Sequence, residues 1–122
     1  MKIIKVRDSL MFNRTSNRSH YYAFFWNRRY KKYNAIQLTH IATKDPNRYI
    51  QANNGLIKPV RIKKLDPYAD SGIKKANFIN DINGNSLHPS IGVIVVDKVS
   101  GSSANKIKRF GTSIYSRGRK IR

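Results

Sequence analysis

This chain contains no cysteine and no glutamate, and its acidic residues are six aspartates. The absence of cysteine excludes disulfides, thiolate metal sites and cysteine nucleophiles. The aspartates are not spaced as a carboxylate cluster, and the three histidines form no H-x-x-x-H pair, so we expect no metal site and no cofactor. The chain also lacks a Walker loop and a dinucleotide-binding fingerprint.

Long hydrophobic runs are missing as well. No apolar segment is long enough to cross a bilayer, and the start at Met1 to Lys5 is too short and too charged for a signal peptide. We therefore expect a cytoplasmic protein without membrane contact. A chain of 122 residues can form one domain with a modest core, and its seven tyrosines, five phenylalanines and one tryptophan are atypical of a disordered basic tail.

Charge of one sign dominates what is present. The 25 lysines and arginines give a formal net charge of +19 at pH 7. A compact chain with this charge repels itself, so we expect the excess to serve a polyanion. Neutralising phosphates releases condensed counterions, which gives strong and salt-sensitive binding. Nucleic acid, RNA or DNA, is the favoured partner, although an acidic protein or an anionic membrane surface would match the same charge.

Two neighbouring segments predict an antiparallel hairpin. Residues 20–27 are dense in aromatic side chains, and residues 33–41 alternate apolar and polar side chains. The cations between them predict a basic loop. Aromatic and cationic residues interleave from Tyr21 to Tyr33, which suits stacking of single-stranded bases, although the same rings could build the core.

Three later segments complete the expected fold. Residues 56–65 alternate as a strand, with Pro59 indicating an edge position or a bulge. An apolar stripe at helical spacing predicts a short helix at residues 71–82. The β-branched run at residues 91–99 predicts the most buried strand. The result is a mainly β fold of about five short strands and one helix, compatible with an SH3-like or OB-like barrel.

The composition changes at Ser100. Residues 1–99 are expected to form the barrel domain, and residues 100–122 a basic C-terminal segment. Residues 100–103 (S-G-S-S) predict a linker, and the remainder carries seven cations and no acid. This segment is either a flexible solvated tail or an arm that becomes ordered along a phosphate backbone.

Metal-free RNA cleavage is compatible with this composition. It needs a base near the 2′-hydroxyl, a proton donor for the leaving oxygen, and cations for the developing phosphorane charge. If the hairpin pairs about its basic loop, the two ends that carry suitable side chains meet at one end of the ladder. The candidate catalytic residues are Arg18, His20, Thr39 and His40. Each also has an ordinary interpretation as a surface cation, an exposed histidine or a strand residue.

Cations in loops, on one strand face and in the C-terminal segment are the candidate contacts to nucleic acid. They are Arg14, Arg28, Arg29, Lys31, Lys32, Arg61, Lys63, Lys108, Arg109, Arg117 and Arg119.

The order of motifs resembles the PemK/MazF-like toxin family over roughly the first 80 residues. Arg18–Asn27 is similar to that family's basic loop and hydrophobic strand, Tyr33–His40 to its strand ending in threonine, and Gly55–Asp66 to a later strand. The resemblance implies an SH3-like barrel, a homodimer and metal-independent cleavage of single-stranded RNA by a toxin held by an acidic antitoxin. It also places the family's catalytic arginine and threonine on Arg18 and Thr39.

The first expectation is therefore a metal-independent endoribonuclease toxin of a toxin–antitoxin-like system, carried by a mobile element or a low-GC bacterium. One alternative is a non-catalytic basic protein that binds RNA or DNA. Another is a small inhibitor that occupies the nucleic-acid groove of another protein.

Overall fold

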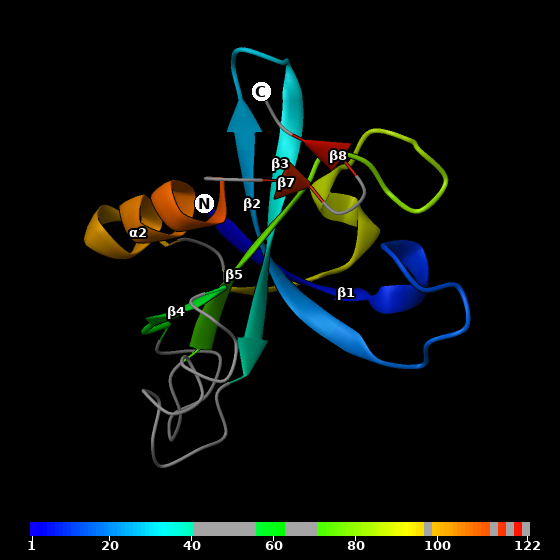
Figure 1. Cartoon of the computed structure of the whole chain (residues 1–122), viewed down its shortest axis with the longest axis horizontal. Helices are drawn as coiled ribbons and strands as arrows, with labels where there is room; N and C mark the ends of the chain where they lie inside the picture. Colours follow the sequence, from blue (N-terminus) through cyan, green and yellow to red (C-terminus); the bar gives the residue numbers. More distant parts are fainter. Residues whose placement is uncertain (41–55, 63–70, 97–98, 113–114, 117–118, 121–122) are drawn as a thin grey trace.

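Antiparallel strands make up most of the structure, a computed structural model that describes residues 1–40, 56–62, 71–96, 99–112, 115–116 and 119–120. The main strands are β1 (Lys2–Arg7), β2 (Ser19–Asn27), β3 (Lys32–His40), β4 (Ile57–Val60), β5 (Ser71–Phe78) and β6 (Val93–Val96). They form one sheet in the order β4-β5-β3-β2-β1-β6 (Figure 1). The remaining elements are the 3-10 turns η1 (Asp8–Leu10) and η2 (Pro89–Ile91), the helix α2 (Gly101–Gly111), and the strand pair β7 (Tyr115–Ser116) and β8 (Arg119–Lys120). The expectation of a mainly β fold is confirmed.

The predicted hairpin is confirmed. β2 and β3 pair in register from Tyr21 opposite Leu38 to Asn27 opposite Lys32. β1 lies on the other side of β2 and begins with Lys2 opposite Phe24. The sequence analysis did not predict β1, because this strand is short and every second or third residue in it is a cation.

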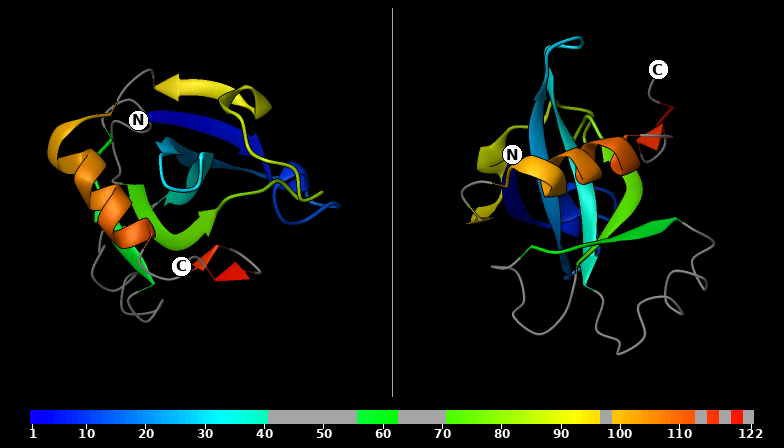
Figure 2. Two further views of the ribbon diagram at one scale, coloured as in Figure 1. Left: turned by 90° about the horizontal axis from the view of Figure 1, so that it is seen from above. Right: turned by 90° about the vertical axis from the view of Figure 1, so that its left-hand side faces the viewer.

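Both faces of the sheet are buried, because the strands in its middle carry apolar side chains in both directions. The sheet curves, and α2 lies against its concave side, packed on β3, β4 and β5 (Figure 2). The core on this face consists of Ile3, Ala23, Ile36, Leu38, Val60, Ile62, Ile73 and Ile107. The opposite face is covered by loops, and its core consists of Ile4, Val6, Met11, Tyr22, Phe24, Ala35, Ala76, Phe78 and Leu87.

The helix predicted at residues 71–82 is wrong. This segment forms β5, which lies inside the sheet between β3 and β4. Ile73 contributes to the core beneath α2, whereas Ala76 and Phe78 contribute to the core on the other face. Over eight residues the spacing of these side chains fits either period, and the two neighbouring strands decide the outcome.

The order of burial among the strands also differs from the prediction. β6 is an edge strand paired only with β1, and the side chains of Val93 and Ile94 are 70% and 45% exposed. β-branched residues indicate a strand, but they do not determine its place in the sheet. The strand predicted around Pro59 is confirmed as β4, and it lies at the other edge of the sheet, where a missing amide donor costs little.

The C-terminal segment does not begin with a linker. Helix α2 starts at Gly101, so the linker prediction for residues 100–103 is wrong. Ile107 from the middle of α2 is completely buried in the core beneath the helix. Within the described ranges, α2 has 11 residues, and no helix reaches the length and apolarity that a bilayer crossing requires.

Candidate nucleic-acid interface

The loop at the tip of the β2–β3 hairpin presents its cations to solvent. Arg28, Arg29 and Lys31 are all exposed. The Asn27 side-chain oxygen accepts hydrogen bonds from the amides of Arg29, at 3.0 Å, and Tyr30, at 3.3 Å. This Asx turn folds the loop back on the strand end and leaves the basic side chains directed outward. The predicted basic loop is therefore confirmed as a loop.

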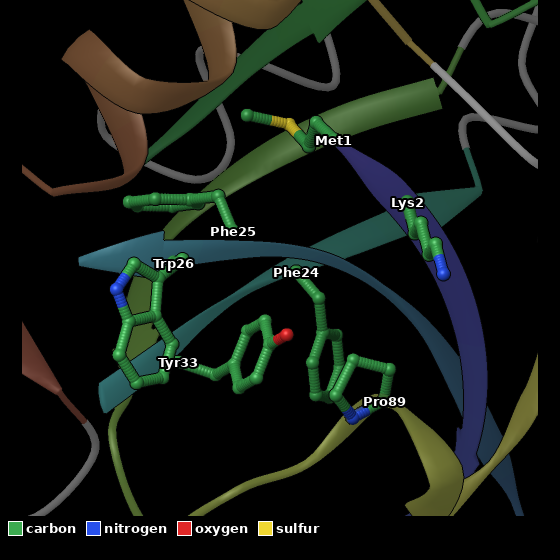
Figure 3. A pocket seen from close by; sticks show the side chains of 7 residues that line it. All are labelled: Met1, Lys2, Phe24, Phe25, Trp26, Tyr33 and Pro89. Atoms are coloured by element: carbon green, nitrogen blue, oxygen red, sulfur yellow. The ribbon is translucent and has the colours of Figure 1, made fainter. Parts of the chain in front are cut away.

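An aromatic pocket lies on the same hairpin, below this loop. The β1–β2 ladder has Lys2 opposite Phe24 as its pair closest to this loop. Beside that pair lies a pocket of about 200 Å³ (Figure 3). It is lined by Met1, Lys2, Phe24, Phe25, Trp26, Tyr33 and Pro89.

The aromatic rings of the pocket hold one another in place. Trp26 meets Tyr33 edge to face, with 5.0 Å between the ring centroids, and Tyr33 meets His88 edge to face at 5.8 Å. Trp26 is nevertheless 52% exposed, whereas Phe24 beneath it is buried. A large aromatic surface thus stands open to solvent in a fixed orientation.

A second basic surface is formed by α2. Lys106, Lys108 and Arg109 are exposed along this helix. The Lys108 ammonium lies 5.4 Å from the centroid of the Phe25 ring, which also lines the pocket. Phe25 therefore connects the basic side of α2 with the aromatic pocket.

At the opposite end of β2, a buried aspartate holds a histidine. Asp8 is 3% exposed, and its Oδ1 lies 2.6 Å from Nδ1 of His20. The Ser16 hydroxyl donates to Asp8 Oδ2 at 3.4 Å, and the Asp8 amide donates to the Arg18 carbonyl at 2.9 Å. A carboxylate can only accept, so His20 donates from Nδ1, and in the neutral tautomer of this kind Nε2 is an acceptor. Asp8 thus orients His20. Its hydrogen bonds to Ser16 and Arg18 also fix the position of the loop that carries Arg14 and Arg18.

The chain matches no family model, no curated protein and no solved structure. Its candidate sites are therefore defined by its own residues. Among the residues that the structure describes, no group of three or more histidine and aspartate side chains could hold a metal ion.

The hairpin does not hold the predicted catalytic residues together. The β2–β3 ladder ends at Tyr21 and Leu38. Beyond that point β2 continues beside β1, whereas Thr39 and His40 pair with β5, and the two strand ends run apart (Figure 1). Arg18 is exposed in the loop before β2, so the ladder does not place it opposite Thr39.

The other predicted contacts are spread over the surface. Arg14 and Arg61 are exposed, Lys32 is half-buried, and the backbone of Arg119 belongs to β8. Lys63 and Arg117 lie outside the described residues. The sequence analysis missed Lys2 and Asp8. Asp8 carried one signal, because it is the only acid before Asp45 in a chain rich in cations.

Proposed function

We propose that this protein binds single-stranded nucleic acid, with RNA as the first candidate, through the hairpin loop and the basic side of α2. The observation that carries the proposal is the exposed Trp26 on the hairpin whose loop also exposes Arg28, Arg29 and Lys31. Cations supply sequence-independent affinity for phosphates, and an open aromatic ring stacks on unpaired bases that a duplex does not present. The net charge of +19 supports the same partner.

Salt titration of a labelled, unstructured RNA tests this proposal. The logarithm of the binding constant should fall linearly with the logarithm of salt concentration, by about 0.7 per phosphate neutralised on a single strand. Arg29→Ser should reduce that slope by about 0.7, because it removes one loop cation. Arg7→Ser is the matched control, since Arg7 is exposed at the end of β1 far from Lys2.

Competitors separate the remaining alternatives. A flat salt response would remove the polyanion partner altogether. Single-stranded DNA that competes equally would show that the 2′-hydroxyl is not recognised. Polyaspartate that displaces RNA at equal charge concentration would favour an acidic protein partner, such as an antitoxin, or the inhibitor function.

A second candidate function is metal-independent cleavage of the bound RNA, and the Asp8–His20 contact favours it. In this reaction His20 Nε2 takes the proton of the 2′-hydroxyl, and the 2′-oxygen attacks the adjacent phosphorus. The bond from phosphorus to the 5′-oxygen breaks, the 5′-oxygen takes a proton from water, and a 2′,3′-cyclic phosphate remains. The exposed Arg14 and Arg18, in the loop that leads to His20, are the candidate cations for the charge that develops on the phosphoryl oxygens.

His20→Asn is the sharpest test of cleavage. The asparagine amide can still donate to Asp8, but it has no base in the place of Nε2. With chelator present, the wild type should cut single-stranded RNA, and the variant should lose about 10²–10⁴ in rate while still binding RNA. His40→Asn is the matched comparison, because His40 is exposed at the end of β3 and its backbone pairs with Ser71 of β5.

The same variant tests the toxin expectation in cells. Induced wild-type protein should arrest bacterial growth, and His20→Asn or Arg18→Ala should relieve the arrest. Tight RNA binding without cleavage would leave nucleic-acid binding as the function.

A further inference from the structure

The pocket beside Trp26 has features of a site for one flat aromatic ring. Its floor is Phe24, which is 2% exposed, and its walls come from β2, β3 and the turn η2. Figure 3 shows Trp26, Tyr33, Phe24 and Pro89 on one side of the β2 ribbon, with Tyr33 between Trp26 and Phe24, and Phe25 and Met1 on the other side. A ligand that enters therefore meets aromatic and apolar surface on several sides.

The size of the pocket restricts the ligand. Sites that enclose drug-sized molecules have about 300–1,000 Å³. This pocket has about 200 Å³. It suits a single ring system whose remaining groups stay outside, rather than a complete nucleotide.

The polar groups of the pocket indicate what the ring is attached to. Lys2 is exposed at its margin, and Lys108 lies against the outer ring Phe25. Two ammonium groups repel a cationic ligand, although aromatic rings alone would attract one. They attract a ligand that carries anionic groups beside its ring. The Tyr33 hydroxyl adds one hydrogen-bonding group inside the pocket, which a base edge can use.

We propose that this pocket holds one unpaired nucleobase, stacked on Trp26, while Lys2 and Lys108 contact the flanking phosphates. The proposal rests on the nucleic-acid binding proposed above and deepens it, because it names the residues that contact the base. On this proposal the protein binds single strands that expose an unpaired base, and it does not bind duplexes in this pocket.

Trp26 is the only tryptophan in the chain, so its fluorescence reports directly on the pocket. Unstructured RNA should quench Trp26 and shield it from acrylamide. Polyphosphate has the charge but no bases, so it should bind without either change. A strand of abasic residues should behave like polyphosphate.

Substitutions measure the contribution of the base. Trp26→Ala should weaken RNA binding about 5- to 150-fold, the range for losing one stacked base. The salt slope should stay unchanged, because no cation is lost. Trp26→Phe should retain much of the affinity. Leu56→Ala is the matched control, since Leu56 is 53% exposed and lies outside the pocket, and it should bind RNA as the wild type does.

The outcomes separate this inference from the function on which it rests. If labelled RNA does not bind at low salt, the proposed function fails. If RNA binds by anisotropy but Trp26→Ala keeps wild-type affinity, only the pocket proposal fails. Equal quenching by polyphosphate and RNA would also overturn it, because charge alone would then account for the signal.

Discussion

Replacing Gly111 with alanine tests whether α2 belongs to the folded core. Gly111 is the last residue of α2 and is buried against Ile36 of β3. A methyl group on Gly111 would lie 2.7 Å from Cδ1 of Ile36 and closer still to its Cγ2. Carbon atoms in packing contact are about 3.5–4.0 Å apart, so the overlap is about 1 Å. Ile36 is completely buried in the core beneath α2, so a shift of its side chain has to displace other core residues.

Whether Gly111→Ala raises or lowers the free energy of unfolding depends on two opposing effects, helix propensity and core packing. Alanine in place of glycine stabilises an exposed helix interior by about 1 kcal/mol. Overpacking a core costs about 1–3 kcal/mol. Gly111 is not among the described glycines with positive φ, so the backbone conformation does not oppose the substitution. Packing therefore decides the sign, and we expect Gly111→Ala to lower the free energy of unfolding.

Urea and thermal unfolding, followed by circular dichroism and Trp26 fluorescence, measure the change. A loss of about 1 kcal/mol corresponds to a Tm lower by roughly 4–8 °C in a small domain. Ile36→Ala removes the atoms in the way, so the double variant should be more stable than the sum of the single losses predicts, with a coupling of about 0.5–3 kcal/mol. Lys106→Ala on the exposed side of α2 is the control and should stay within about 0.5 kcal/mol. A Gly111→Ala protein more stable than the wild type would refute the packing of α2.

Three further substitutions and one deletion test other parts of the fold. Ile107→Ala should lower the free energy of unfolding in urea by about 2–5 kcal/mol, because Ile107 is fully buried. For the same reason, deleting α2 should abolish cooperative folding. A chain without α2 that kept wild-type stability would contradict this expectation. Asp8→Asn should cost about 1–3 kcal/mol, because it weakens the buried contact to His20; an unchanged midpoint would show that the contact does not form in solution. Val93→Lys should change the free energy of unfolding by less than about 0.5 kcal/mol, because Val93 is 70% exposed on the edge strand. A large loss of stability would instead show that β6 is buried, as the sequence predicted.

The hairpin was predictable because its signals are local. An aromatic run, a cationic turn and an alternating run follow one another between His20 and His40, and adjacent strands of this kind pair directly. β5 was not predictable in the same way. Its apolar side chains fit a helical stripe, and they occupy a strand because β3 and β4 supply partners from distant parts of the chain. Ile107 was overlooked for a related reason, since the cations around it indicated a solvated segment.

The aromatic pocket and the Asp8–His20 contact depend on the register in which β1 pairs with β2, more than on composition. The basic loop follows from the sequence itself. The aromatic pocket depends on the register of β1 and β2, which places Lys2 opposite Phe24, two residues from Trp26. The same ladder pairs Val6 with His20 and leaves Asp8, just past the end of β1, close enough to contact the His20 ring. No short motif records a pairing between residues so far apart, and only the isolation of Asp8 among cations indicated a contact.

One strand, β2, relates the two candidate sites. His20 and Trp26 are six residues apart along β2, so they share a face of the sheet and are separated by about 20 Å. Tyr22 and Phe24 lie between them on that face and are buried beneath the loops. A bound strand that reaches both sites must therefore pass around this covered region, and neither side chain can act through contact with the other. The proposed base binding and the proposed proton transfer should therefore be separable. Trp26→Ala should raise KM and leave kcat unchanged, whereas His20→Asn should lower kcat and leave RNA affinity unchanged. A variant at either residue that changed both quantities equally would show that the two ends of β2 work as one site.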